Sequence, residues 1–116
     1  MPDTYGKPNE ETPLLVAVDG GGSGCRVLIL NRQGKVVGAA QGGSANVVSD
    51  YTKSLENIEA AVHQAYQNAG IVEAKSSKDT IVLGLAGAES DPKIDRLKQH
   101  LDFGRVLVYS DLEATV

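Results

Sequence analysis

The sequence predicts an α/β fold, in which a mixed sheet carries helices on its faces. Five short apolar runs have the length and composition of strands, at residues 14–19, 26–31, 35–41, 80–87 and 105–111. Two segments with helical periodicity lie between them, at 50–69 and 90–101. The predicted order is therefore β-β-β-α-β-α-β, and a strand that returns to the same sheet through a helix requires a right-handed crossover.

The first three strands are expected to form an antiparallel meander. LLVAVD at 14–19 is almost wholly apolar, as expected of a strand buried on both faces. A glycine-rich loop leads from it to RVLILN at 26–31, and the polar turn RQGK leads on to KVVGAAQ at 35–41. Because two tight connections each reverse the chain, the third strand runs parallel to the first.

Both helices have recognisable ends. Ser49 or Asp50 can cap the N-terminus of the first helix, and Gly70 is a natural stop at its end. Six residues are predicted to form its sheet-facing side: Leu55, Ile58, Val62, Ala65, Tyr66 and Ala69. The second helix is expected to begin with Asp91 as its cap and Pro92 in its first position. The last five residues, LEATV, are typical of the first turn of a further helix.

Strand direction brings several loops together. Right-handed crossovers keep the fourth and fifth strands parallel to the first, so the segments DGGGS, GGSAN, GAES and SDLE all follow strands at one edge of the sheet. These segments are rich in glycine and small hydroxyl residues. Ligands of α/β proteins bind outside the carboxyl ends of the strands, so the residues alone predict a site at this edge.

The loop DGGGS has two interpretations. Glycines let a backbone approach a ligand and turn several N–H groups toward one anion, while Ser23 adds a hydroxyl donor. Because neither the Walker ending nor G-x-G-x-x-G before a helix is present, the loop would be a hairpin-type phosphate clamp. The alternative is a wide β-turn with flexible glycines. Asp19, at the end of a buried strand, would either face Mg²⁺ or cap the loop's own N–H groups.

Three further residues at this edge carry open alternatives. Asp111 could accept the proton of a substrate hydroxyl during phosphoryl transfer, or it could cap a helix that begins at SDLEA. Asn46 could offer a sugar both a donor and an acceptor, or it could be a turn residue. Gly87 would line the same edge, although GAESDP is otherwise an ordinary helix entry.

Composition excludes several classes of protein. With 15 acidic and 11 basic residues, the net charge is −4 and no Lys/Arg stripe is visible, so we expect neither nucleic acid nor a membrane surface as a partner. No apolar run is long enough for a membrane span, and no signal peptide is visible, which predicts a cytoplasmic protein. Cys25 is the single cysteine and is expected to be buried, whereas His63 and His100 are expected on helix surfaces, without metal-ligand spacing.

Three segments resemble a known family: VAVDGGGSGCRVLILNRQGKVVGAAQGGSANV, GLAGAES and VYSDLEATV. They are similar to the N-terminal lobe of the BadF/BadG/BcrA/BcrD ATPase family, and within it to the N-acetylglucosamine and glucosamine kinases. The resemblance covers residues 14–116, with 1–13 as a flexible leader. It implies a ribonuclease-H-like lobe of the actin, heat-shock chaperone and sugar kinase superfamily, truncated before its last helix.

The same resemblance implies the cofactors, partners and residue roles of an amino-sugar kinase. ATP and Mg²⁺ would be the cofactors, an amino sugar the substrate, the C-terminal lobe of the same polypeptide a partner, and a homodimer the assembly; the fragment alone is expected to be inactive. Asp19 would lie near Mg²⁺, Asn46 and Gly87 would contact the sugar, and Asp111 would be the catalytic base that also meets the sugar. The phosphate-facing residues would be Gly20, Gly21, Gly22, Ser23 and Arg26, with Arg26 the candidate replacement for a lysine that many relatives carry at position 24.

Two other functions compete with the kinase. An ATPase activator or regulatory ATP-binding module of the same family would lack a sugar substrate, and Asn46 is the residue it would not need. A ribonuclease-H-like nuclease could use Asp19 and Asp111 as metal-binding carboxylates, but the acidic charge and the glycine loop disfavour it. We also expect exposed apolar surface near the fifth strand, and self-association through it.

Overall fold

The computed structural model describes residues 13–47, 49–71, 78–85 and 92–109. The strands are β1 (Leu15–Gly20), β2 (Cys25–Leu30), β3 (Val36–Gly42), β4 (Thr80–Leu85) and β5 (Arg105–Tyr109), and the helices are α1 (Tyr51–Asn68) and α2 (Lys93–His100). The predicted bounds agree with these to within one residue wherever both can be compared. The predicted ends at 86–87, 90–91 and 110–111 lie outside the described residues.

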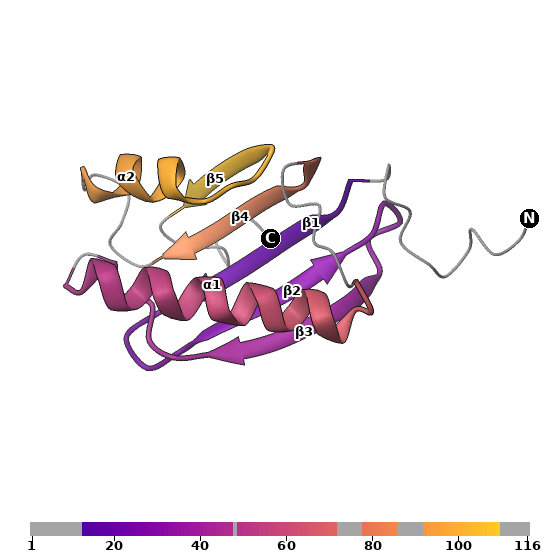
Figure 1. Ribbon diagram of the computed structural model, residues 1–116, viewed down its shortest axis with the longest axis horizontal. Helices are drawn as coiled ribbons and strands as arrows, with labels where there is room; N and C mark the ends of the chain where they lie inside the picture. Colours follow the sequence, from indigo (N-terminus) through magenta and orange to yellow (C-terminus); the bar gives the residue numbers. More distant parts are fainter. Residues whose placement is uncertain (1–12, 48, 72–77, 86–91, 110–116) are drawn as a thin grey trace, which may run out of the picture.

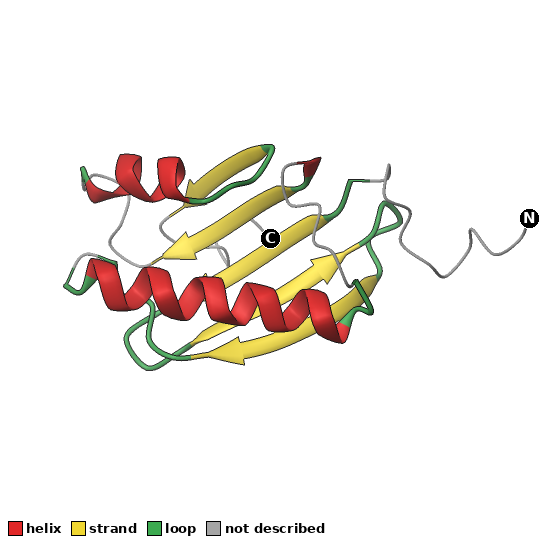
Figure 2. Cartoon of the chain, viewed as in Figure 1, coloured by secondary structure: helices red, strands yellow, loops and turns green. Residues whose placement is uncertain are grey.

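The strands form one mixed sheet in the order β3-β2-β1-β4-β5 (Figures 1 and 2). β1 pairs antiparallel with β2, and β2 with β3, while β1 pairs parallel with β4, and β4 with β5. The arrows of β3, β4 and β5 accordingly point the same way in Figure 1, with β2 reversed. The predicted α/β fold and its strand directions are therefore confirmed.

The core lies between α1 and one face of the sheet. Six side chains from the three central strands are wholly buried there: Val16, Val18, Val27, Ile29, Ile81 and Leu83. They occupy matching positions in the register, so they form two rows across the sheet. α1 covers these rows with Ile58, Val62, Ala65 and Tyr66, four of the six residues predicted for its buried side. Within the described residues, no helix has the length and apolar character of a membrane span.

The other face of the sheet is only partly covered. In β1, buried and accessible residues alternate, and Leu15 on the accessible side is 38% exposed. The expectation that β1 is buried on both faces is therefore wrong, because α1 packs on one face alone. Tyr109, at the end of β5, is 43% exposed. The apolar residues before it in β5 are partly buried, so an exposed apolar surface there, and self-association through it, stay predictions.

α1 begins and ends at the predicted signals, and it approaches β3 closely. The Asp50 carboxylate accepts a hydrogen bond from Lys53 N–H at 3.1 Å, so Asp50 is the cap rather than Ser49. Gly70 has a φ of +82°, the left-handed conformation that favours glycine after a helix. A Cβ atom at Gly38 would lie 2.5 Å from the Ala65 carbonyl oxygen, so only glycine permits this approach. At α2, Pro92 lies one position before the helix, while Asp91 is outside the described residues.

A buried carboxylate joins three parts of the chain at the opposite edge from the predicted site. Asp79, just before β4, is 3% exposed. Its two carboxylate oxygens accept hydrogen bonds from Leu14 N–H at 2.9 Å and from the Tyr66 hydroxyl at 2.7 Å. Its backbone carbonyl accepts another from Gly104 N–H at 2.9 Å. Asp79 therefore fixes the starts of β1 and β5 and the last turn of α1 relative to one another.

Tyr66 makes the fold sensitive to alkali. Burial first, and then the hydrogen bond to Asp79, raise the pKa of its phenol well above the ordinary value near 10.0. The stability that this neutral phenol supplies is complete below about pH 10 and declines as the pH rises further, because only the unfolded state then loses the proton readily. Above about pH 10, the free energy of unfolding should fall more steeply with pH in the wild type than in Tyr66→Phe.

Urea unfolding at a series of pH values measures this difference. Tyr109→Phe is the matched control, because Tyr109 is exposed and its hydroxyl does not contact Asp79. Equal slopes in the wild type and Tyr66→Phe would contradict the role given to Tyr66.

Candidate functional site

Two of the four predicted segments meet at the carboxyl edge of the sheet. The loop after β1 and the loop after β3 are joined by a hydrogen bond of 2.8 Å from Ala45 N–H to the Gly21 carbonyl. A Cβ atom at Gly20 would lie 2.8 Å from the Ala45 Cβ, so the two loops are also packed together. The other two segments, with Gly87 and Asp111, lie outside the described residues.

The fold requires glycine at one position of this edge but not at the next two. At Gly20, a side chain would collide with Ala45 and with Leu85, so packing alone accounts for the glycine. At Gly21 and Gly22, a Cβ atom would meet nothing within 4 Å, and neither residue has a left-handed φ. Nothing in the described fold therefore requires glycine at positions 21 and 22.

The loop also presents backbone donors to solvent. Gly21 N–H closes the turn by donating to the Gly24 carbonyl at 3.0 Å. Gly22 and Ser23 are exposed, and their N–H groups donate to no other group in the described part of the chain. Neighbouring backbone N–H groups and a hydroxyl without partners are groups that can donate hydrogen bonds to an anion.

Asp19 and Arg26 lie opposite each other on the accessible face of the sheet. They are partners in the register of β1 and β2, and both are exposed. The sequence placed Asp19 at the end of a strand buried on both faces, but Asp19 is exposed, since it points away from the face covered by α1. An exposed carboxylate is an oxygen ligand that can hold a hydrated Mg²⁺. Among the described residues, no group of three or more metal-binding side chains exists, so Mg²⁺ at Asp19 stays a prediction.

Asn46 is a turn residue, one of the two roles left open by the sequence, and the sugar-binding role stays a prediction. Its side-chain oxygen accepts a hydrogen bond from Ser49 N–H at 3.2 Å, and its backbone carbonyl accepts one from Asp50 N–H at 3.0 Å. The neighbouring Ala45 and Val47 are each 1% exposed and anchor the loop in the core. Asn46 itself is exposed, and its amide nitrogen donates to no other described residue. It is thus a turn residue whose donor remains available at the edge.

Three residues with reactive side chains are not among the predicted site residues. Cys25 is buried, as predicted, and burial raises the pKa of its thiol. His63 and His100 are exposed on α1 and α2, also as predicted. His100 is not isolated, because its Nδ1 lies 2.6 Å from the Tyr51 hydroxyl.

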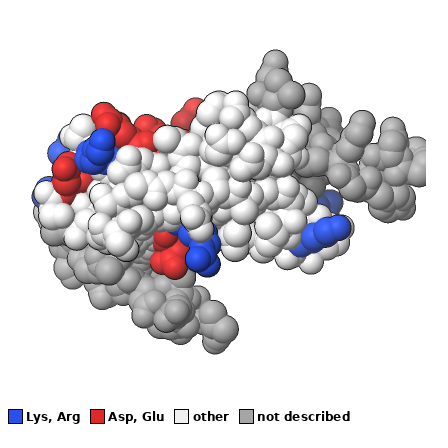
Figure 3. Space-filling model, turned by 90° about the horizontal axis from the view of Figure 1, so that it is seen from below, with Lys and Arg blue, Asp and Glu red and all other residues white. Residues whose placement is uncertain are grey.

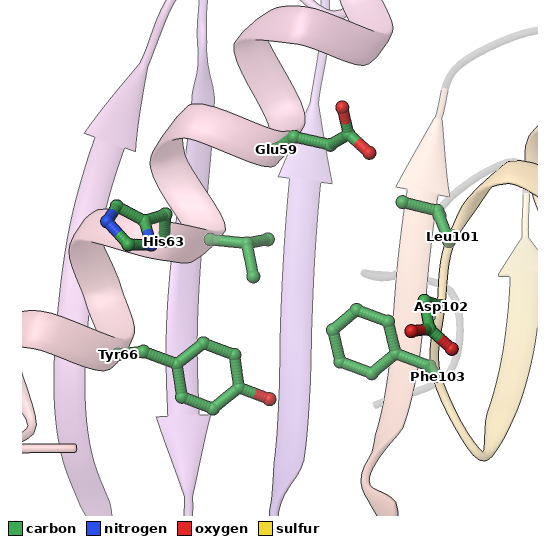
Figure 4. A pocket seen from close by; sticks show the side chains of 7 residues that line it. Glu59, His63, Tyr66, Leu101, Asp102 and Phe103 are labelled. Carbon is green, nitrogen blue, oxygen red and sulfur yellow. The ribbon is translucent and has the colours of Figure 1, made fainter. Parts of the chain in front are cut away.

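A cavity of about 180 Å³ lies elsewhere, between α1 and the segment after α2 (Figure 4). Its lining comprises Glu59, Val62, His63, Tyr66, Leu101, Asp102 and Phe103. None of the predicted site residues lines it. On the face shown in Figure 3, Lys and Arg side chains form small separate groups with uncharged surface between them, so this face offers no continuous basic band.

Known proteins of similar sequence and structure are amino-sugar kinases by name. No family model matches the chain. Glucosamine kinase GspK of Vibrio cholerae is 39% identical over 74 residues, which make up 64% of this chain and 25% of that protein. A crystal structure named "Putative N-acetylglucosamine Kinase", from Chromobacterium violaceum, superposes with a TM-score of 0.76 at 27% identity, covering 84% of this chain and 35% of that one.

These comparisons show an amino-sugar-kinase-like fold. The chain spans a quarter of the length of the curated relative. Membership of the BadF/BadG/BcrA/BcrD family stays a prediction, because no family model matches.

Proposed function

We propose that residues 14–116 form the N-terminal lobe of an ATP-dependent kinase that phosphorylates an amino sugar, glucosamine or N-acetylglucosamine. The observation that carries this proposal is the loop after β1, where Gly21 and Gly22 have no packing or conformational requirement and Gly22 and Ser23 present free N–H groups. Glycine at such a position leaves room for a ligand to approach the backbone. The names of the similar proteins support an amino sugar as the substrate.

Each site residue has a role in this proposal. The Gly20–Ser23 loop and Arg26 hold the phosphates of ATP, and the Asp19 carboxylate holds Mg²⁺, which would neutralise phosphate charge when bound. Asn46, with Gly87, binds the sugar. Asp111 accepts the proton of the sugar hydroxyl, so that the oxygen can attack the terminal phosphate. The C-terminal lobe of the same polypeptide closes over the nucleotide and excludes water.

An ATPase activator or regulatory ATP-binding module is the second candidate. It would share the phosphate loop but have no sugar substrate. The free amide of Asn46 favours the kinase, because its donor lies at the same edge as the phosphate loop and has no structural partner among the described residues. A homodimer is a further prediction of the kinase reading.

Gly22→Ala tests the phosphate loop. Because a Cβ atom at position 22 meets nothing within 4 Å, the free energy of unfolding should change by less than about 1 kcal/mol. Binding of ATP with Mg²⁺, measured by calorimetry, should weaken by about tenfold or more, because the methyl group lies where the phosphate approaches the amide.

Gly20→Ala tests packing in the same loop, for comparison with Gly22→Ala. Its methyl group would meet Ala45 and Leu85 within 3 Å, so the free energy of unfolding should fall by about 1–3 kcal/mol. If Gly22→Ala bound the nucleotide as the wild type does, the phosphate clamp would be wrong and the glycines would belong to a plain turn.

A further inference from the structure

Asn57 connects α1 to the loop after β3. The side chain is half-buried on the inner side of α1, and its Nδ2 donates to the Ser44 carbonyl at 2.8 Å. A Cβ atom at Gly43 would lie 2.8 Å from the same Nδ2, so the amide lies flat against the backbone of the loop. No sequence pattern singles out Asn57, since an asparagine within a helix is usually a solvated residue.

The hydrogen bond from Asn57 continues into the phosphate loop. The Ser44 carbonyl and Ala45 N–H belong to one peptide group, and Ala45 N–H donates to the Gly21 carbonyl at 2.8 Å. This peptide group is therefore held at both ends, at its oxygen by Asn57 and at its nitrogen by Gly21. Rotation of the group would break both hydrogen bonds together.

The Gly21 carbonyl in turn determines the direction of Gly22 N–H. Both belong to the next peptide group in the series, and the described residues contain no cis peptide bond. In a planar trans peptide, the carbonyl and the N–H point in opposite directions. Because the Gly21 carbonyl points at Ala45, Gly22 N–H points away from the loop after β3.

We propose that Asn57 is a positioning residue that orients Gly22 N–H through the Ser44–Ala45 and Gly21–Gly22 peptide groups. That Gly22 N–H holds a phosphate rests on the proposed function, whereas the orientation of this N–H group by Asn57 does not. A donor that already points toward the ligand site needs no reorganisation on binding. It therefore stabilises a bound anion more than a donor that must first reorient. The same bond fixes the loop that presents Asn46, so one helix side chain aligns both halves of the site.

The chain offers a matched control on the same helix. Asn68 also donates from Nδ2 to a backbone carbonyl of the meander, that of Ala39, at 2.7 Å. It lies in the last turn of α1, and among the described residues no hydrogen bond connects the Ala39 carbonyl to either loop of the site. Asn57→Asp and Asn68→Asp each replace an amide donor by a carboxylate of the same shape, which repels the carbonyl oxygen.

The experiment compares the two variants with the wild-type chain by NMR. We expect Asn57→Asp to speed amide hydrogen exchange of Ala45 by about tenfold or more and to change the residual dipolar coupling of Gly22 N–H. We expect Asn68→Asp to change neither, although it also removes an amide donor from a backbone carbonyl of the meander. Titration with inorganic triphosphate, followed at the Gly22 and Ser23 amides, should show affinity reduced by about tenfold in Asn57→Asp alone.

The proposal would be overturned if the two variants had equal hydrogen exchange rates at the Ala45 amide and equal residual dipolar couplings at Gly22 N–H. If the wild type failed to bind triphosphate, the proposed function would lose its support, but exchange and couplings would still decide the role of Asn57. Should Asn57→Asp not fold, Asn57→Ala takes its place, because it removes the donor without adding repulsion, and the same two readouts decide the outcome.

Discussion

Replacing Asp79 with alanine is expected to lower the free energy of unfolding by about 3 kcal/mol or more. The carboxylate is 3% exposed, and each of its oxygens accepts a hydrogen bond from a buried donor, Leu14 N–H or the Tyr66 hydroxyl. Alanine would leave both donors without an acceptor, and each such donor costs about 1–3 kcal/mol. Since small domains are stable by only about 5–15 kcal/mol, this loss is a large part of the whole.

The cost is high because Asp79 joins segments that are distant in the sequence. Leu14 precedes β1 and Tyr66 lies near the end of α1, so no neighbouring group along the chain can replace the lost acceptor. Asp79→Asn keeps one acceptor oxygen and should lose less stability than Asp79→Ala. Urea unfolding measures the loss of stability in both variants. Asp95→Asn is the control, because Asp95 is exposed on α2. A loss below about 0.5 kcal/mol in Asp79→Ala, the size of an ordinary surface change, would refute the role.

Replacing Asp111 with asparagine is expected to reduce phosphorylation of the amino sugar by about 10²–10⁴-fold, in a form of the protein that carries out the reaction. The proposal makes the Asp111 carboxylate the acceptor of the sugar hydroxyl proton. Asparagine has the same shape but cannot accept that proton at neutral pH. Binding of the sugar should remain measurable, because most contacts to it are unchanged, so the loss should appear in kcat rather than in KM.

The alternative for Asp111 is a helix cap, and the same variant separates the two roles. Asparagine caps helices about as well as aspartate, so a capping residue would tolerate Asp111→Asn with little change in turnover. Asp102→Asn is the control for removal of a carboxylate, because Asp102 is exposed in the connection between α2 and β5. Undiminished turnover in Asp111→Asn would remove the general base from the proposed mechanism.

Local sequence patterns were sufficient to predict the helices and strands and the directions in which the strands run. Local features carry this information: an apolar run such as 14–19 makes a strand, a 3.6-residue period places Ile58 and Val62 on the inner side of a helix, and Gly70 ends that helix. Two tight connections and two crossovers then left one set of strand directions, which brought the loops after β1 and β3 to one edge. Each step depends on residues close together in the chain.

The tertiary structure alone decided which residues of that edge are required by the fold. Gly20 and Gly22 belong to one run of glycines, and the sequence does not distinguish them. In the structure, Gly20 is packed against Ala45 while Gly22 faces open space. Asp19 follows an apolar strand, yet it is exposed, because only one face of β1 is covered by α1. Such differences depend on neighbours contributed by distant parts of the chain.

The roles of Asp79 and Asn57 could not be predicted from the sequence for the same reason. Asp79 and Asn57 belong to no motif, and each acts through a hydrogen bond to a partner 13 or more residues away. A buried polar group must find such a partner, but its identity depends on how the elements pack. The local pattern of the sequence therefore determined the framework, while contacts between distant residues decided how its polar groups are held and which groups are left to meet a ligand.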